Sequence, residues 1–208
     1  MTSGSCLRIG FDFDDVLINT ADCAVRLYNK RYNTQLNNDD WYDFRDLSIW
    51  GADSISGIAV RLIKVIYSEE FNNIAKPILD SQKVLKELKS DGHSLFIITG
   101  RPKSALIQTK AILNEYYQSV FDNEHVYFTD NFSIDGKKTT KDEIISTLNL
   151  NYFIDDDVEH VNMVNKIGVR TILFDNNYAW NKIGVDKDIV KLSNWQSIKE
   201  FIDKEVGL

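Results

Sequence analysis

The stretch Leu7-Arg8-Ile9-Gly10-Phe11-Asp12-Phe13-Asp14-Asp15-Val16 begins as an apolar, β-prone run and ends with three acidic residues in four positions. Such a run is typical of a strand buried in a parallel sheet, and ligands of open α/β sheets bind beyond the carboxyl ends of the strands. Asp12 and Asp14 can therefore border one site. Two carboxylates about 4 Å apart repel by roughly 4 kcal/mol at an effective dielectric constant of 20. A divalent cation, a shared proton or basic neighbours would offset this repulsion, and a solvated acidic turn is the alternative.

Composition restricts the class of protein. The chain has 208 residues, of which 43% are hydrophobic, which is enough for one core and a modest insertion. No run approaches the ~18 apolar residues of a membrane span, and residues 1–5 do not lead into the apolar segment of a signal peptide. A net charge of −7 without a basic cluster argues against binding a nucleic-acid polymer. Cys6 and Cys23 fit no metal-binding spacing and are too few for a disulfide framework, which favours a reducing, cytoplasmic compartment.

Beyond residue 80, strand-like and helix-like segments alternate. Runs of apolar, β-branched and aromatic residues predict four strands, at residues 94–99, 126–128, 151–154 and 169–174. Apolar residues at helical spacing predict helices between these strands and a last helix at residues 195–206. Strands that alternate with helices pair in parallel, so we predict an α/β fold with a doubly wound parallel sheet, in which the strand at 169–174 is the last.

The segment between the first strand and this alternating region has a different character. Apolar residues at helical spacing predict a helix at residues 21–32. Residues 37–77 are rich in aromatic residues and acids, and their one strong helical pattern lies at residues 55–66. No strand pattern interrupts this segment. We therefore expect a small all-helical cap, residues 19–77, inserted after the first strand of a core that comprises residues 1–18 and 78–208.

Polar groups also follow the strand at residues 94–99. Thr99-Gly100-Arg101 places a hydroxyl group, a glycine and a guanidinium group directly after a buried strand. Glycine lets the backbone approach an anion closely, and the planar fork of arginine suits phosphate oxygens. The alternative is an ordinary turn between a strand and a helix, with a solvated arginine.

Lys141 has an unfavourable place for a cation. Thr140 and Glu143 fit a capping box, which puts Lys141 in the first turn of a helix. A positive charge there opposes the helix dipole, at a cost of roughly a few tenths of a kcal/mol. This mild conflict favours a functional role for Lys141. A solvated charge run that also includes Lys137 and Lys138 is the alternative.

Three consecutive acids follow the strand at residues 151–154. Asp157 can be explained as the N-cap of the next helix, whereas Asp155 and Asp156 have no such explanation. Together the loops supply carboxylates, a hydroxyl group and a lysine around one crevice. Phosphoryl transfer needs this inventory: an aspartate nucleophile, a metal ion that neutralises phosphoryl oxygens, and a cation for the transferred charge.

These residues resemble the haloacid-dehalogenase-like (HAD) phosphatases. Four signatures of that family match in order: Asp12-Phe13-Asp14 with Val16, Thr99-Gly100, Lys141, and Asp155-Asp156. The resemblance covers about residues 7–180, and it implies a Rossmann-like core.

Within these phosphatases, the chain is most similar to the 5'(3')-deoxyribonucleotidase-like branch. The stretches that carry this likeness are Lys141-Asp142-Glu143-Ile144-Ile145, Phe153-Ile154-Asp155-Asp156-Asp157, Gly168, Ile172-Leu173-Phe174-Asp175 and Asn177-Tyr178. The chain departs from the branch in two places. Asp15 stands where the family often has glycine, and Thr99-Gly100-Arg101-Pro102 stands where these enzymes usually have Thr-Ser-Pro.

The resemblance implies a role for each matching residue. Asp12 would be the nucleophile that becomes an aspartyl-phosphate, and Asp14 would protonate the leaving oxygen and then activate water. Mg²⁺ would be held by the Asp12 carboxylate, the Asp14 backbone carbonyl and Asp156, with Asp155 beside these ligands.

The resemblance also assigns the substrate contacts. By this resemblance Thr99, Gly100 and Lys141 would hold the phosphoryl oxygens, and aromatic side chains of the cap would face the nucleobase. Arg101 is added to the phosphate-binding residues because its planar fork suits phosphate oxygens. Our candidates for stacking on the base are Trp41, Phe44 and Trp50.

The expected function is a Mg²⁺-dependent phosphomonoesterase whose partner is a small phosphomonoester, in particular a (deoxy)nucleoside monophosphate. One alternative is a phosphatase for another small phosphomonoester or for a broad range of them. The other is an inactive protein that binds a phosphorylated ligand. No membrane contact is expected, and a homodimer is an open alternative to a monomer.

Overall fold

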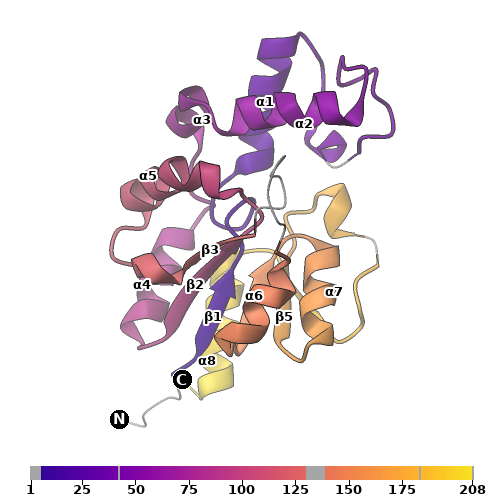
Figure 1. Ribbon diagram of the computed structural model, residues 1–208. Coiled ribbons are helices and arrows are strands. Elements are labelled where there is room, and N and C mark those ends of the chain that lie inside the picture. The colour runs from indigo at the N-terminus through magenta and orange to yellow at the C-terminus, as the bar shows by residue number, and fades with distance from the viewer. Residues whose placement is uncertain (1–5, 42, 130–138, 183, 208) are drawn as a thin grey trace.

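The strand β1 (Arg8–Phe11) lies in the interior of a six-stranded sheet in this computed structural model, which describes residues 6–41, 43–129, 139–182 and 184–207 (Figure 1). The remaining strands are β2 (Ser94–Thr99), β3 (Val126–Phe128), β4 (Tyr152–Asp155), β5 (Arg170–Phe174) and β6 (Val190–Leu192). Their order in the sheet is β3-β2-β1-β4-β5-β6, and every neighbouring pair is parallel. The predicted doubly wound α/β fold is confirmed.

The strand predictions hold to within one residue at either end, with one omission. β2 and β3 begin and end where the sequence predicts, and β4 and β5 begin one residue later. The prediction that the sheet ends with the strand at 169–174 is wrong, because β6 pairs with β5 at the sheet edge through Ile172 and Val190. A strand of three residues is too short for a period of two to stand out from its surroundings.

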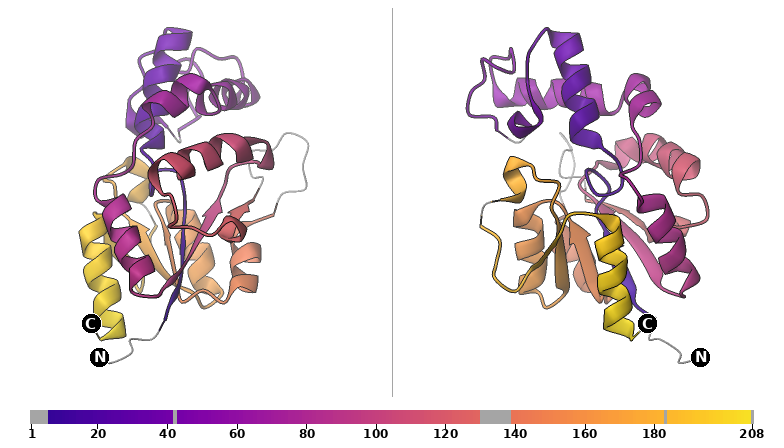
Figure 2. Two further views of the ribbon diagram at one scale, coloured as in Figure 1. Left: turned by 90° about the vertical axis from the view of Figure 1, so that its left-hand side faces the viewer. Right: turned by 180° about the vertical axis from the view of Figure 1, so that it is seen from behind.

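Helices cover both faces of the sheet (Figures 1 and 2). One face carries α4 (Ser81–Ser90), α5 (Leu106–Tyr116) and α8 (Trp195–Val206), and the other carries α6 (Lys141–Leu148) and α7 (Val158–Lys166). Phe11 packs against Trp195 of α8 on the first face, with ring centroids 5.5 Å apart. On the second face, Phe96 belongs to an apolar cluster with Ile145 of α6. The sheet is thus buried on both sides, which explains the continuous apolar runs in its central strands.

Residues 19–77, which we call the cap segment, lie beyond the carboxyl ends of the strands (Figures 1 and 2). Their helices are α1 (Thr20–Tyr32), the 3₁₀ helix η1 (Asn38–Asp40), α2 (Ile55–Ile66) and α3 (Glu69–Ile74). The chain enters and leaves the cap segment at one place, because Asn19 N donates to Lys76 O at 3.1 Å and Ile78 N donates to Leu17 O at 2.8 Å. Among its described residues the cap segment contains helices and loops but no strand.

The sequence predicts α1 and α2 of the cap segment but not its third α-helix, α3. The short helix α3 follows α2 directly, and the Ser68 hydroxyl caps it by accepting a hydrogen bond from Phe71 N at 3.1 Å. Six residues give fewer than two helical turns, so no apolar stripe can be recognised.

Short 3₁₀ turns complete the core: η2 (Lys103–Ala105), η3 (Asn123–His125) and η4 (Ala179–Asn181). None of the helices in the described part of the chain is long and apolar enough to cross a membrane.

Candidate active site

The site lies where the order of the strands reverses. β1 has β2 on one side and β4 on the other, although β4 comes much later in the chain. Such a reversal leaves a crevice at the carboxyl ends of the strands. Asp12 follows β1 directly, and its backbone N–H donates to Ile154 O in β4 at 2.8 Å. The first acidic motif is therefore held beside the last, as the sequence predicts.

Lys141 joins these two motifs. Its Nζ lies 2.8 Å from Asp12 Oδ1 and 2.6 Å from Asp155 Oδ2, and its side chain is 1% exposed. The predicted capping box of Thr140 and Glu143 is present and places Lys141 as the first residue of α6. Burial opposes the charged form, but the two carboxylates outweigh it and raise the pKa of Lys141. Lys141 is thus a buried, paired cation, whereas Lys137 and Lys138 lie outside the described residues.

Three buried carboxylates converge at this point. Asp12, Asp155 and Asp156 each offer an oxygen atom, and these atoms lie within 4.8 Å of one another. Burial raises the pKa of Asp12 to about 7, with Asp155 and Asp14 adding to the effect and Lys141 opposing it. Burial and neighbouring carboxylates also raise the pKa of Asp156. A cluster that resists full ionisation in the protein alone, built of hard oxygen donors, fits a cation such as Mg²⁺.

Asp155 and Asp156 have different surroundings. The oxygens of Asp155 are both engaged, Oδ2 with Lys141 and Oδ1 with the Asp157 N–H at 2.9 Å. Burial would raise the pKa of Asp155, but Lys141 and then His160 hold it below its usual value. Asp156 Oδ2 accepts a hydrogen bond from Trp180 Nε1 at 2.7 Å. Asp156 therefore has the freer carboxylate for a metal ion, and Asp155 is fixed as the partner of Lys141.

The sequence does not predict the contacts of Trp180 and Asn181 with Asp156. Asn181 Nδ2 donates to the backbone carbonyl of Asp156, so η4 holds both the main chain and the side chain of this residue. The two residues are more than twenty positions from Asp156 in the chain. The stretch Asn177-Tyr178 nearby marks the family likeness, but it carries no local pattern that predicts this contact.

Arg101 follows β2 at the crevice, as the sequence predicts, and its contact with phosphate oxygens stays a prediction. Its guanidinium group contacts Asp14 with two nitrogens, Nε to Oδ2 at 2.9 Å and Nη2 to Oδ1 at 2.7 Å. The hydroxyl group of Thr20, the first residue of α1, also donates to Asp14 Oδ1. Asp14 is therefore held between the core and the cap segment, and its side chain remains 26% exposed.

Thr99 is the last residue of β2, which lies next to β1, and Gly100 follows it directly, as the sequence predicts. The Thr99 side chain is fully buried, and its Oγ1 accepts a hydrogen bond from Arg101 N at 3.2 Å. Its hydroxyl proton can therefore be donated to another acceptor in the crevice.

Asp15, the residue that replaces the glycine common in the family, has a left-handed backbone conformation with φ of 55°. Glycine adopts this conformation most easily, and aspartate tolerates it better than most residues. The Asp15 carboxylate accepts the Ala21 N–H at 2.9 Å from Oδ1, so it caps the first turn of α1. Asp15 thus fastens the loop after β1, residues 12–18, to the cap segment.

An apolar pocket of about 240 Å³ lies between α2 and the loop after β1. Its floor is polar, with Asp14, Thr20 and Arg101. Its walls are apolar, with Trp41, Phe44 and the side chains Ile55, Ile58, Ala59, Leu62, Ile63, Ile66 and Tyr67. Trp41 and Phe44 thus lie where we expect the substrate. Trp50 is not among the lining residues, because its side chain is fully buried against Tyr28 and Phe44.

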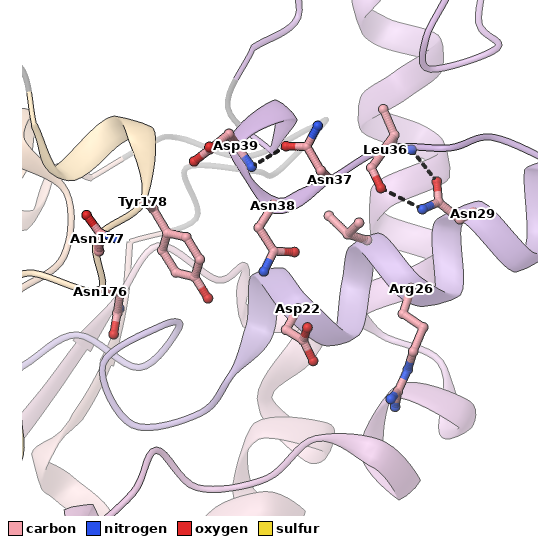
Figure 3. Close-up of a pocket in the computed structure, with 11 residues that line it drawn as sticks. Asp22, Arg26, Asn29, Leu36, Asn37, Asn38, Asp39, Asn176, Asn177 and Tyr178 are labelled. Carbon is pink, nitrogen blue, oxygen red and sulfur yellow. Dashed lines mark hydrogen bonds between the residues drawn. The ribbon is translucent and has the colours of Figure 1, made fainter.

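A second, wider groove of about 640 Å³ lies at the junction of α1, η1 and the loop after β5. Side chains from all three elements surround it, including Asp22, Asn38 and Tyr178 (Figure 3). At this junction Asp39 Oδ1 accepts a hydrogen bond from Ala179 N at 2.9 Å. The cap segment is thereby joined to η4, the element that holds Asp156.

Solved structures with this fold are phosphatase-like proteins. A predicted phosphatase from Clostridium acetobutylicum superposes with a TM-score of 0.66 at 17% identity, covering 96% of this chain and 100% of that one. A haloacid dehalogenase-like family hydrolase from Streptococcus pneumoniae superposes with a TM-score of 0.65 at 15% identity, covering 97% and 100%. At these identities the likeness shows the fold alone.

Similarity in sequence shows the family as well as the fold. A protein of Bacillus cereus named "Putative nucleotidase" is 27% identical over 203 residues, which are 96% of this chain and 100% of the relative. Together with the site described above, the family match shows that the chain is a phosphoric monoester hydrolase of the HAD class. It belongs to the family described as "5' nucleotidase, deoxy (Pyrimidine), cytosolic type C protein", whose model matches residues 6–206. The resemblance inferred from the sequence motifs is confirmed.

Proposed function

We propose that this protein is a Mg²⁺-dependent nucleotidase that removes the phosphoryl group of (deoxy)nucleoside monophosphates through an aspartyl-phosphate at Asp12. The observation that carries the proposal is the meeting of Asp12, Lys141 and Asp156 at one buried point, beside a pocket that begins at Asp14. Carboxylate nucleophile, cation and metal-binding acids are the parts that phosphoryl transfer requires. Free cysteines, Cys6 exposed and Cys23 buried, suit an enzyme of the cytoplasm.

The reaction runs in two halves. In the first half, an Asp12 oxygen attacks phosphorus while the ester P–O bond breaks. The electron pair of that bond leaves with the ester oxygen, which takes a proton from Asp14. In the second half, the Asp14 carboxylate takes a proton from water, whose oxygen attacks phosphorus and releases inorganic phosphate and the Asp12 carboxylate.

Charge in both halves is balanced by fixed groups. The carboxylates of Asp12 and Asp156 and the backbone carbonyl of Asp14 would hold Mg²⁺, which would supply positive charge to the phosphoryl oxygens when bound. Lys141 adds a positive charge at Asp12, and the Thr99 hydroxyl and the Gly100 N–H donate to phosphoryl oxygens. Asp155 keeps Lys141 in place at an Nζ–Oδ2 distance of 2.6 Å.

The leaving group would occupy the apolar pocket. The pocket starts at Asp14, the group that protonates the leaving oxygen, and Trp41 and Phe44 offer flat apolar surfaces to a base. Its volume of about 240 Å³ suits a small organic group. We propose further that the cap segment, residues 19–77, acts as a domain that closes over the crevice and excludes water from the phosphoryl group.

A panel of phosphomonoesters with Mg²⁺ tests this proposal. The panel comprises nucleoside and deoxynucleoside monophosphates, sugar phosphates, glycerol phosphate and p-nitrophenyl phosphate, each measured also with EDTA. We expect the highest kcat/KM for nucleoside monophosphates and no turnover in EDTA. Equal values across the panel would support a phosphatase of broad range. Binding of the phosphates without hydrolysis would support an inactive ligand-binding protein.

A further inference from the structure

The side chain of Arg101 is among the largest that are completely buried in the described part of the chain. Its Nε and Nη2 atoms engage both oxygens of Asp14, and Nη1 lies 3.3 Å from the hydroxyl oxygen of Thr109. A two-pronged contact of this kind fixes the carboxylate in both distance and orientation. Asp14 is thus held by the guanidinium group at the floor of the apolar pocket, which both residues line.

Three aromatic rings surround the same guanidinium group. The central carbon of Arg101 lies 4.5 Å from the centroid of Phe13, 5.7 Å from that of Tyr67 and 5.8 Å from that of Phe71. Contacts between a guanidinium group and aromatic faces within about 6 Å are attractive, and more so when water is excluded. Phe13 belongs to the loop after β1, whereas Tyr67 and Phe71 belong to the cap segment. Arg101 therefore has all three aromatic contacts only when the cap segment lies on the core.

This arrangement differs from that of a phosphate-binding arginine. A phosphate contact needs guanidinium N–H groups directed at the transferred oxygens. Here one N–H group on each of Nε, Nη2 and Nη1 is directed at Asp14 or Thr109, and the side chain is 1% exposed. The cation that contacts the nucleophile Asp12 is Lys141.

We propose that Arg101 is a positioning residue that holds Asp14 at the leaving-group oxygen, and that the cap segment controls this position through Tyr67 and Phe71. The inference rests on the proposed phosphatase mechanism. In the step concerned, Asp14 gives its proton to the ester oxygen as the P–O bond breaks and the bond to Asp12 forms. Docking of the cap segment thus positions Asp14, the proton donor, at the same time as it closes the pocket.

Leaving groups of different basicity test the proposal, because only a basic leaving group needs the proton of Asp14. The quantity to compare is kcat/KM, which reports the steps up to phosphoenzyme formation, for glycerol phosphate and for p-nitrophenyl phosphate. We expect Arg101→Gln to lower kcat/KM for glycerol phosphate by roughly 10²–10⁴-fold, the usual size of general acid catalysis. For p-nitrophenyl phosphate, whose leaving group departs as a stable anion, the loss should stay below about tenfold by the same reasoning.

The cap segment supplies a second variant and its control. Tyr67→Leu removes one of the three rings around Arg101. It should lower kcat/KM for glycerol phosphate more than for p-nitrophenyl phosphate, in the same direction as Arg101→Gln. Tyr32→Leu is the matched control, because Tyr32 has an arginine, Arg61, 4.6 Å from its ring centroid but lies away from Asp14. It should leave the ratio of the two substrates unchanged. Arg170→Gln is the corresponding control for loss of an arginine, since its ion-pair partner is Glu205.

Each outcome decides the matter. Equal losses for both substrates in Arg101→Gln, with weaker inhibition by inorganic phosphate, would show that Arg101 binds the phosphoryl group and would overturn the proposal. A wild-type substrate ratio in Tyr67→Leu would overturn the control by the cap segment. If Arg101→Gln does not fold, Arg101→Lys keeps the charge, loses the two-pronged contact and is read in the same way. Failure of the wild-type protein to hydrolyse any of these esters would instead contradict the proposed function.

Discussion

Lys141 Nζ lies 2.8 Å from Asp12 Oδ1, and both side chains are almost completely buried. A buried carboxylate beside other carboxylates is unfavourable unless a cation compensates it. Lys141 supplies part of that compensation, and a bound metal ion would supply the rest. Asp12, the proposed nucleophile, is thus kept in a place where its charge is unfavourable, which is common at catalytic sites.

Replacing Lys141 should reduce activity far more than replacing its charged neighbours in the chain. We expect Lys141→Ala to lower kcat by roughly 10²–10³-fold, the usual cost of losing one donor that stabilises transition-state charge. It should also destabilise the fold, by about 3 kcal/mol or more, because Asp12 and Asp155 lose a buried partner. Lys137→Ala and Lys138→Ala are the controls, measured by phosphate release and thermal unfolding. Similar losses in all three variants would favour the interpretation as a solvated charge run.

The stability of the metal-free protein should depend on pH through Asp12. Burial raises the pKa of Asp12 in the folded state to about 7, whereas the unfolded value is about 3.9. The folded state therefore holds more protons between these values, and the free energy of unfolding falls as the pH rises through this range. At about 1.4 kcal/mol per pH unit, the contribution is at most about 4 kcal/mol.

The variant Asp12→Asn removes this titration. In EDTA, its stability relative to wild type should increase as the pH is raised from 4 to 8, and added Mg²⁺ should stabilise wild type but not the variant. Urea unfolding at several pH values measures both effects. If the stability of Asp12→Asn relative to wild type does not change with pH, the raised pKa assigned to Asp12 is contradicted.

Trp180 should affect metal binding rather than folding alone. Trp180→Phe removes the hydrogen bond to Asp156 Oδ2 but keeps an aromatic ring beside Tyr178, on which Trp180 stacks. We expect the Mg²⁺ concentration for half-maximal activity to rise by about 10–100-fold, as when a group that orients a metal ligand is lost. Trp195→Phe is the matched control, because it also removes an indole hydrogen bond, in this case to Val16 O at 3.1 Å. An unchanged Mg²⁺ dependence in Trp180→Phe would separate Trp180 from the metal site.

The main features of the fold could be predicted because they follow local patterns. The capping boxes and caps at Thr140 and Asp157 are present where the sequence places them. The two elements that the sequence analysis misses, α3 and β6, have six and three residues. Such short elements depend on their neighbours more than on their own sequence, since β6 exists only by pairing with β5.

The candidate site could be predicted in part for a similar reason. Asp12 and Asp155 meet because β1 and β4 are neighbours, and polar residues after parallel strands gather at one edge. The contact between Arg101 and Asp14 joins residues 87 positions apart and depends on the position of the guanidinium group, which spacing does not reveal. The same is true of Trp50, whose aromatic character fits equally a substrate contact and the interior of the cap segment.

Aromatic residues of the cap segment should affect nucleotides and small phosphates differently. Trp41→Leu or Phe44→Leu should lower kcat/KM for a nucleoside monophosphate by roughly 10–100-fold, because base stacking is worth about 1–3 kcal/mol. The same variants should hardly change kcat/KM for glycerol phosphate, which has no base. Trp50→Leu, outside the pocket, should act on both substrates alike through stability. Parallel losses in all three variants would show that the rings serve only the packing of the cap segment.

The most direct test of the mechanism is the detection of a phosphoryl group on Asp12 during turnover. The enzyme is mixed with a nucleoside monophosphate and Mg²⁺, quenched in acid and analysed by mass spectrometry of the intact protein and its peptides. We predict that wild type gains one phosphoryl group on the peptide that contains Asp12, that Asp14→Asn forms it slowly with a basic leaving group, and that Asp12→Asn neither forms it nor turns over. Near-normal turnover by Asp12→Asn, or a phosphoryl group on another residue, would contradict the account.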